Sequence, residues 1–205
     1  MSGGTGGDSV FGGNGNDIIY GNQDLDSLEG GEGNDTIFAG QNTGPLTLAD
    51  DGRMLQLDGV ETVLGGGGDD LIYGNYGAET AYGQQGSDTL FGGQGDDTLY
   101  GGEGADSLAG NRANDHLFGG AGADSFVFST NGAVDTVYDF NLAEGDKLRL
   151  GANINGTGIA TAEDVLARVG VDATGNAVID LGGGNSVKLI GVAPSELNAS
   201  AFQIG

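Results

Sequence analysis

Apolar residues recur once every nine positions along the first 127 residues, and the polar residues between them repeat as well. Residues 12–20, 92–100 and 101–109 are full copies, with glycine at positions one, two and four, an acid at position six and an apolar residue at position eight. This period fits neither a helix nor a plain strand, but it fits a six-residue turn followed by a three-residue strand with one inward side chain. We therefore predict an all-β, flattened parallel solenoid with two nonapeptides per coil and coils stacked about 4.8 Å apart.

The residues at position eight form the predicted core of this solenoid. They are Val10, Ile19, Leu28, Ile37, Ile72, Leu90, Leu99, Leu108, Leu117 and Phe126, with Ala81 as a smaller member. Position nine is aromatic in most copies, at Phe11, Tyr20, Phe38, Tyr73, Tyr82, Phe91, Tyr100 and Phe118. Two interpretations of these aromatic residues stand: a ladder of stacked rings within each sheet, and an exposed adhesive face that pairs molecules.

Residues 40–64 interrupt the period. Apolar and polar residues alternate in 46–48 and 54–57, and Asp50-Asp51-Gly52 lies between the two runs, which indicates a hairpin. We expect this insertion either to bulge from one edge of the solenoid or to project as a partner-binding element. We also expect it to split the solenoid into two stacks.

The repeats end after Val127, and residues 128–205 are predicted to form a C-terminal cap. A solenoid end exposes apolar core and free strand edges, which such a cap covers. A short helix is expected over 161–169, with Thr161 as N-cap and Asp164 at N3. The runs 177–181 and 186–190 flank glycines and indicate a hairpin, and 194–202 indicates a last helical turn.

Composition limits the classes of protein that fit. The chain of 205 residues has 45 glycines and only 2 prolines, which excludes a mostly helical fold and a collagen. It has 30 acidic residues against 6 basic ones and a net charge of -24, so a nucleic-acid partner is not expected. There is no cysteine and no run of 18 apolar residues, so neither disulfides nor a membrane span are predicted.

The acidic residues recur at one position of the repeat rather than at random, because position six is acidic in every copy. We predict these aspartates as metal ligands: Asp8, Asp17, Asp26, Asp35, Asp70, Asp88, Asp97, Asp106, Asp115 and Asp124. Glu79 occupies the same position with a longer side chain. The competing interpretation is that the aspartates only cap turns through hydrogen bonds to the backbone.

Calcium is the ion that fits these turns. It takes six to eight oxygen ligands in irregular geometry, and glycine turns leave their carbonyls uncovered. Magnesium requires strict octahedra, and zinc lacks ligands because the chain has no cysteine and only His116. Without an ion, carboxylates stacked about 5 Å apart repel by about 3 kcal/mol per pair. Calcium is therefore expected to be a condition of folding.

Three copies depart from the pattern and are predicted to bind calcium weakly or not at all. Asp24 replaces a glycine in the turn of Asp26, Glu79 replaces an aspartate, and Arg112 and Ala113 lie in the turn of Asp115.

The tandem nonapeptide resembles the RTX (repeats-in-toxin) calcium-binding family. The resemblance implies a parallel β-roll that folds on multiple calcium ions outside the cell. It also implies that the uncharged C-terminal end, 201–205, is similar to the uncleaved signals that type I secretion machinery reads, whereas residues 1–11 lack the features of a signal peptide.

No catalytic motif is recognised, and His116 alone is predicted to be a strand-surface residue. We therefore expect a non-enzymatic, secreted, structural or surface-associated protein that forms a homo-oligomer or matrix. The alternative is the C-terminal folding and secretion module of a larger RTX toxin, protease, lipase or epimerase. Ice binding is a third, weaker interpretation, because position three is irregular.

Overall fold

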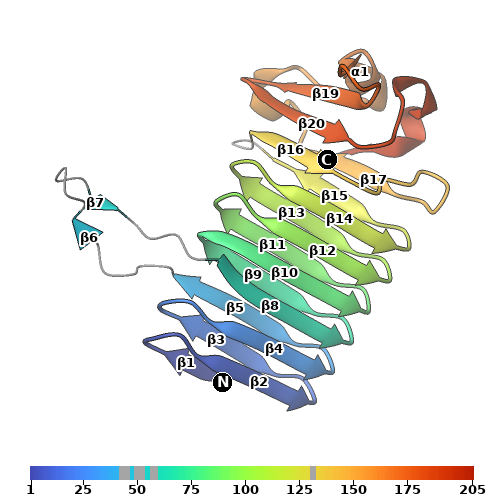
Figure 1. Ribbon diagram of the computed structural model, residues 1–205. Helices are drawn as coiled ribbons and strands as arrows, with labels where there is room; N and C mark the ends of the chain where they lie inside the picture. Colours follow the sequence, from blue (N-terminus) through green and yellow to red (C-terminus); the bar gives the residue numbers. More distant parts are fainter. Residues whose placement is uncertain (42–46, 49–53, 56–59, 130–132) are drawn as a thin grey trace.

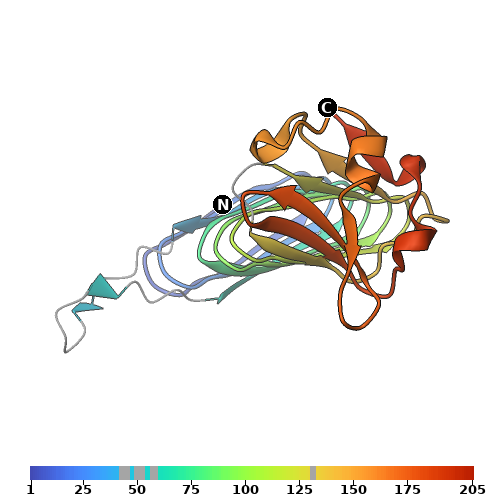
Figure 2. The same ribbon diagram turned by 90° about the horizontal axis from the view of Figure 1, so that it is seen from above.

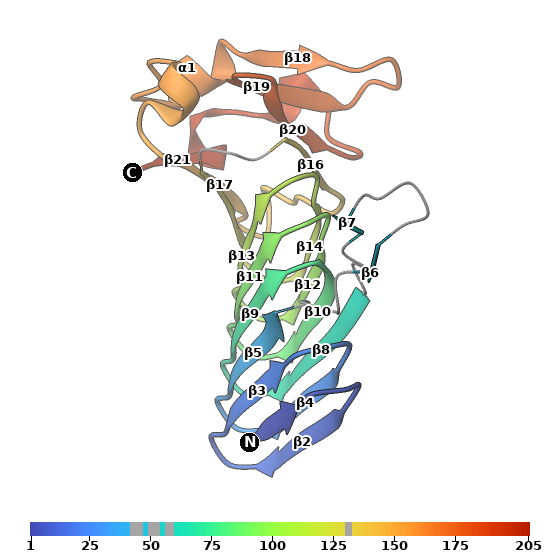
Figure 3. The ribbon, with the colours of Figure 1, turned by 90° about the vertical axis from the view of Figure 1, so that its left-hand side faces the viewer.

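The structure, a computed structural model, describes residues 1–41, 47–48, 54–55, 60–129 and 133–205. Two sheets lie face to face along one axis, and the chain crosses from one to the other in every half-coil (Figure 1). The view from above shows the coils lying over one another (Figure 2), and the side view shows the C-terminal elements across one end of the stack (Figure 3). The all-β parallel roll predicted from the sequence is confirmed.

The first sheet has nine strands among the described residues. In spatial order they are β1 (Ser2–Gly4), β3 (Ile18–Asn22), β5 (Thr36–Gln41), β9 (Leu71–Tyr76), β11 (Thr89–Gln94), β13 (Ser107–Arg112), β15 (Ser125–Phe128), β17 (Lys147–Leu150) and β21 (Phe202–Ile204). The adjacent pairs of this sheet are parallel.

The second sheet has ten strands in the described part of the chain. In spatial order they are β2 (Ser9–Asn14), β4 (Ser27–Glu32), β8 (Val60–Gly67), β10 (Ala78–Gln85), β12 (Thr98–Glu103), β14 (His116–Ala121), β16 (Val134–Val137), β20 (Asn185–Leu189), β19 (Ala177–Gly182) and β18 (Val169–Val171). The order is parallel from β2 to β20 and antiparallel in the last two pairs.

The register confirms two nonapeptides per coil. Leu90 pairs with Leu108 in the first sheet, and Leu99 pairs with Leu117 in the second, so residues 18 apart lie over one another. The position-eight side chains fill the space between the sheets, and all are buried except Val10, which is half-buried in the first coil.

The strands are longer than the sequence pattern predicted. Most span six residues rather than three, because pairing continues through the first residues of the next repeat. In β11, for example, Gly93 and Gln94 still pair with Asn75 and Tyr76 of β9. The turn that carries the acid is correspondingly shorter than expected.

The insertion forms a hairpin but does not split the roll. Thr47 pairs with Leu55 and Leu48 with Met54, so β6 (Thr47–Leu48) and β7 (Met54–Leu55) are antiparallel as predicted. The predicted turn at 50–52 lies outside the described residues. The expectation of two stacks is wrong, because β4 pairs with β8 and β5 with β9 across the interruption. Val63 pairs with Leu28 and fills position eight, so the core column continues.

The C-terminal part adds strands to both sheets and folds over their end. The helix α1 (Ala162–Leu166) begins after Thr161, whose side chain forms a reciprocal capping box with Asp164, as predicted. The hairpin of β19 and β20 is also confirmed. Short 3-10 turns complete this part: η1 (Ile154–Gly156), η2 (Pro194–Glu196) and η3 (Ala199–Ala201), the last two in the predicted helical region. A domain boundary at residue 127 stays a prediction.

The helices in the described ranges are all too short or too polar to cross a membrane.

Candidate metal centres along two edges of the roll

The acids at position six form two rows, one along each edge where the chain passes between the sheets. Edge I carries the turns from the first sheet to the second, and edge II carries the turns back. The edge I row is Asp8, Asp26, Glu61, Glu79, Asp97, Asp115 and Asp135. The edge II row is Asp17, Asp35, Asp70, Asp88, Asp106, Asp124 and Asp146. All ten predicted ligands therefore lie in these two rows.

Hydrogen bonds join the edge II row without a break. The backbone N–H of each aspartate donates to Oδ1 of the aspartate one coil further on, over 2.7–2.9 Å, from Asp17 to Asp146. Edge I has the same bonds between Asp8 and Asp26 and from Glu79 through to Asp135, at 2.9–3.1 Å. Such bonds fix the carboxylate plane and hold one coil to the next.

The second oxygen of each predicted ligand has no such partner. Oδ2 is buried and accepts no hydrogen bond in all ten aspartates that the sequence singled out. Hydrogen bonds to the backbone therefore account for one carboxylate oxygen of every predicted ligand except Asp8 and Asp17, which begin the two rows, and they leave Oδ2 without a partner. A buried carboxylate oxygen without a partner is costly unless a cation or a proton neutralises it.

The glycine at position one makes room for this oxygen. A Cβ at Gly83 would overlap Oδ2 of Asp88 and would lie 2.6 Å from the carbonyl oxygen of Gly101 in the next coil. A carboxylate oxygen and a carbonyl oxygen thus converge on a space that any side chain would fill, and hard oxygens of this kind are what calcium prefers. Among the described residues no three His, Asp or Glu side chains gather around one point, so backbone carbonyls are needed to complete a shell.

Glycine is needed at position one for a different reason from positions two and four. Positions two and four do adopt positive φ, for example 122° at Gly93 and 128° at Gly95. Position one does not, so the residue there is glycine for lack of space rather than for backbone freedom.

Burial makes both rows hard to ionise when no cation is bound. Burial, together with repulsion from neighbouring aspartates, raises the pKa of Asp70, Asp88, Asp106 and Asp124 to about 6, although the backbone hydrogen bonds act to lower it. On edge I burial raises the pKa of Asp115 to about 8. Both ion pairs between described residues, Arg168–Asp180 and Lys188–Asp172, lie in the C-terminal part. In the described part of the chain, therefore, no basic side chain pairs with a carboxylate of either row.

Three members of the rows were not predicted: Glu61, Asp135 and Asp146. Each precedes an inward apolar residue by two positions, at Val63, Val137 and Leu148. The sequence signal for a member of the rows is therefore an acidic residue two positions before an inward apolar residue. This signal is present in these three segments although the glycines of the repeat are absent.

The last turn of edge II differs from the others because both carboxylate oxygens of Asp146 and of Asp139 accept hydrogen bonds. Oδ2 of Asp146 accepts the N–H of Asn141 at 2.8 Å. Both oxygens of Asp139 accept N–H groups, from Gly119 and Gly120, at 2.9 Å. Backbone donors replace a cation here, so the row ends without an unpartnered carboxylate oxygen.

The three departing repeats all lie on edge I. The turns of Asp26, Glu79 and Asp115 alternate with the regular turns of edge II. Asp24 and Ala113 occupy position four with φ of 71° and 74°, a region that favours glycine. The side chain of Asp24 also forms a hydrogen bond with the preceding coil, because its Oδ2 accepts the N–H of Gly6 at 2.8 Å. Oδ2 of Asp26 and of Asp115 nevertheless remains unpartnered, and their weak binding stays a prediction.

Aromatic residues form two ladders on the outer faces, which confirms the first interpretation of position nine. Tyr20, Phe38, Tyr73 and Phe91 stack at 5.0–5.2 Å between ring centroids on the first sheet. Tyr82, Tyr100, Phe118 and Tyr138 stack at 4.5–4.7 Å on the second. His116 is exposed on β14, with Nδ1 2.7 Å from the hydroxyl of Tyr138.

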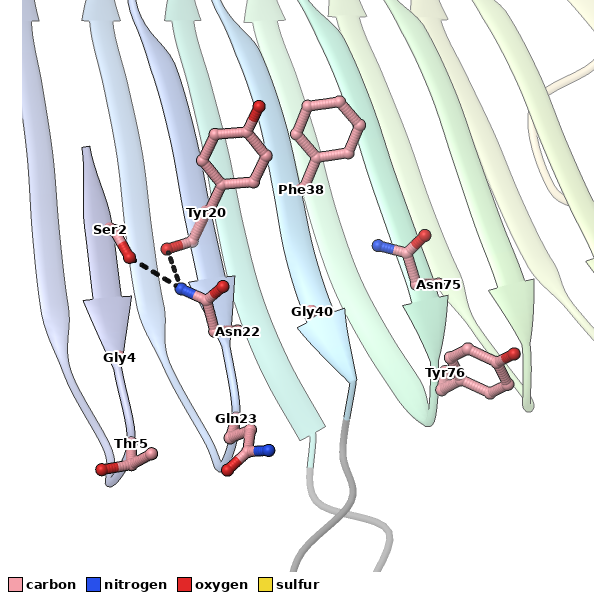
Figure 4. A pocket seen from close by; sticks show the side chains of 10 residues that line it. All are labelled: Ser2, Gly4, Thr5, Tyr20, Asn22, Gln23, Phe38, Gly40, Asn75 and Tyr76. Carbon is pink, nitrogen blue, oxygen red and sulfur yellow. Dashed lines mark hydrogen bonds between the residues drawn. The ribbon is translucent and has the colours of Figure 1, made fainter.

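An open groove of about 580 Å³ lies beside the first ladder (Figure 4). Tyr20, Phe38 and Tyr76 line it together with amide side chains such as Asn22, which donates to Oγ of Ser2 at 2.9 Å. No acidic, basic or histidine side chain lines this groove, so it is separate from the rows of carboxylates.

Comparisons with known proteins agree with the repeat. The RTX calcium-binding nonapeptide repeat matches in four copies, over residues 2–37, 57–90, 73–108 and 100–128, which is more than half of the chain. No curated protein matches.

Among solved structures, the extracellular lipase LipA from Serratia marcescens aligns over 97% of this chain and 38% of its own, with 19% identity and a TM-score of 0.39. The AlgE6R3 subunit of the Azotobacter vinelandii mannuronan C5-epimerase aligns over 67% of this chain and 78% of its own, with 28% identity and a TM-score of 0.33. The repeat matches and the two rows of buried aspartates together assign the chain to the RTX calcium-binding nonapeptide repeat family.

Proposed function

We propose that this protein is a secreted calcium-responsive β-roll, which stays unfolded where calcium is scarce and folds outside the cell. One observation carries the proposal: ten aspartates each hold a buried carboxylate oxygen that accepts no hydrogen bond and lies on an edge of the roll. These oxygens repel one another unless cations lie between the coils. Calcium bound between successive turns converts that repulsion into attraction.

The energy of calcium binding is large enough to decide folding. Extracellular calcium modules have Kd values of about 0.1 to 1 mM, and about 10 mM free calcium then contributes roughly 1.4 to 2.7 kcal/mol per site. Several sites together reach the stability of a typical domain, which is about 5 to 15 kcal/mol. The roll is therefore expected to fold cooperatively with calcium.

Circular dichroism tests this function directly. The far-UV spectrum in EGTA should be that of an unfolded chain, and calcium titration should restore the β spectrum with a sigmoidal dependence. A chain that keeps its β spectrum in EGTA at neutral pH would contradict the proposal.

Self-assembly is a second proposed function, and the partly exposed ladders support it. Tyr82, Tyr100 and Phe118 form a continuous row of rings on one outer face. Exposed aromatic rows usually mark contacts. Substitution of all three by serine should abolish calcium-dependent light scattering and leave the monomer folded. Loss of folding together with assembly would show that the row serves only as an intrasheet ladder.

The same roll would also serve as the calcium-dependent folding and secretion module of a larger secreted enzyme. The intact mass of the natural protein separates this alternative from a free-standing structural protein. Detection of the protein in the culture medium, dependent on a type I secretion system, tests the proposed route.

A further inference from the structure

The first sheet differs from the second because its strands carry no acidic residue. None of its nine described strands contains aspartate or glutamate, although the chain has 30 acidic residues. The strands of the second sheet do contain them, for example Glu29 and Glu32 in β4 and Glu103 in β12. The outer face of the first sheet therefore offers an uncharged surface on a strongly acidic chain.

Asparagine and glycine alternate along one side of this face. The residues at position two of successive coils lie next to one another, in the order Gly4, Asn22, Gly40, Asn75, Gly93 and Asn111. Asparagine thus recurs in every second coil, at a spacing of about 9.6 Å. Each glycine leaves a notch between two amide side chains. The groove beside the first ladder lies over the notch at Gly40 (Figure 4).

The amides on the two sides of this notch are oriented by their own strands. Nδ2 of Asn22 donates to Oγ of Ser2 at 2.9 Å and to the carbonyl oxygen of Tyr20 at 3.2 Å. Nδ2 of Asn75 donates to the carbonyl oxygen of Tyr73 at 3.3 Å. Figure 4 shows Oδ1 of Asn22 and the amide nitrogen of Asn75 turned toward the notch. An acceptor and a donor that face the same space suit a hydroxyl group, because a hydroxyl both donates and accepts.

Two tyrosines with an uncovered ring face lie on either side of the notch. Tyr20 is the first ring of the ladder, so one of its faces stacks on Phe38 and the other lies beside the small Ser2, its partner in β1. Tyr76 stacks on no other ring among the described residues. The exposed fractions of Tyr20 and Tyr76 are 44% and 41%. Aromatic faces pack against the C–H faces of sugar rings, whereas amide groups bind sugar hydroxyls.

We propose that this groove binds an uncharged, extended β-linked polysaccharide that runs along the axis of the roll. Tyr20 and Tyr76 stack on sugar rings, and Asn22 and Asn75 bind hydroxyl groups between them. The coil spacing of about 4.8 Å is close to the length of one sugar residue in such a chain, so asparagine meets every second sugar. An anionic polymer is disfavoured, because no basic side chain lines the groove and the chain has a net charge of -24.

Affinity electrophoresis tests the groove with two polymers that share one backbone. Hydroxyethyl cellulose is uncharged and carboxymethyl cellulose is anionic. In native gels that contain calcium, the first polymer should retard the folded protein and the second should retard it less. Titration calorimetry with the hexamer of N-acetylglucosamine should also detect binding. Binding of neither hydroxyethyl cellulose nor the hexamer would overturn the inference, and so would stronger retardation by carboxymethyl cellulose.

Two variants remove the amides by copying other coils of the same row. Asn22→Gly and Asn75→Gly place glycine as Gly40 and Gly93 do, at φ of 81° and 80°, which glycine adopts readily. The double variant should bind the polysaccharide at least about tenfold more weakly. Asn111→Gly is the matched control, because it makes the same change in β13, outside the groove, and it should leave binding unchanged. Equal affinities of the double variant and the wild type would contradict the proposed site.

A third variant removes one of the two rings. Tyr76→Gln copies Gln94, its partner in β11, and should also weaken binding at least about tenfold. Phe11→Gln, at a ring that is 61% exposed on the second sheet, should have no effect. A second copy of the chain is the competing occupant of an exposed aromatic face. Dimerisation in gel filtration that Tyr76→Gln abolishes, without binding of either glycan, would overturn the inference in favour of that occupant.

Discussion

The two edges of the roll have the same number of acids in their rows but differ in regularity. Edge II is an unbroken series of aspartates joined by one type of hydrogen bond. Edge I contains two glutamates, the insertion and the three departing repeats. Because each coil crosses both edges, a regular edge II can keep the coils in register while edge I changes. Edge II therefore holds the coils together, and edge I is where the chain departs from the repeat.

The largest expected effect comes from removing three ligands of one edge at a time. Replacing Asp70, Asp88 and Asp106 by asparagine on edge II should cost about 4 to 8 kcal/mol at about 10 mM calcium, if each site contributes as proposed. The same change at Asp26, Asp97 and Asp115 on edge I should cost less, because two of these turns are irregular. Calcium titrations followed by circular dichroism measure both. Equal losses would refute the difference between the edges.

The position-one glycines give the next effect. Gly83→Ala places a methyl group against Oδ2 of Asp88 and should destabilise the calcium-loaded roll by about 1 to 3 kcal/mol, as overpacking does. Gly151→Ala is the matched control, because a Cβ there meets nothing within 4 Å. Urea denaturation in saturating calcium gives both values. A harmless Gly83→Ala would show that the space beside the carboxylate holds no ion.

In the absence of calcium, the dependence of the roll's stability on pH also distinguishes the two edges. In the roll the pKa values of Asp70, Asp88 and Asp106 on edge II and of Asp115 on edge I are raised above their unfolded values, so protonation of these carboxyls stabilises the fold. This stabilisation is complete below about pH 4, where unfolded carboxyls are also protonated, and is lost as the pH rises through the folded pKa values. For edge II that loss centres near pH 6, and for Asp115 of edge I near pH 8.

Circular dichroism in EGTA from pH 4 to 9 should therefore show more β structure at acid pH than at neutral pH. Asp115→Asn should reduce the part of the transition that extends above pH 7, the remainder belonging to Glu79, whose pKa burial raises to about 9, and Asp106→Asn should leave that part in place. A spectrum that gains β structure as the pH rises would contradict the assigned sign.

The smallest expected effect is a gain in stability on edge I. Ala113 has φ of 74°, and Ala113→Gly should stabilise the roll by about 0.5 to 1 kcal/mol, the left-handed strain less the entropy cost of glycine. Ala105 on edge II is exposed and has no positive φ, so Ala105→Gly should destabilise the roll slightly. Thermal unfolding in calcium measures both. If Ala113→Gly is also destabilising, strain does not explain the weakness of that turn.

Much of the candidate site was predictable because the chain repeats. Residues at positions six and eight face one direction in every coil, so the ten aspartates and the core column followed from the period. Glu61, Asp135 and Asp146 escaped the pattern because the glycines around them are missing, although each still precedes a core residue by two positions. The separation into edges was also readable from the sequence, since alternate repeats of an 18-residue coil must lie on opposite edges.

The sequence by itself determined the parallel roll, its inward residues, the hairpin strands of the insertion and the capped helix at Thr161. Those features depend on local period, turn residues and capping, which act over a few positions. Only the tertiary structure decided that the roll continues across the insertion, that position one is glycine for lack of space, and that one carboxylate oxygen per turn remains unpartnered. These depend on contacts between coils, which residues 18 or more apart in the chain make only when the stack has formed.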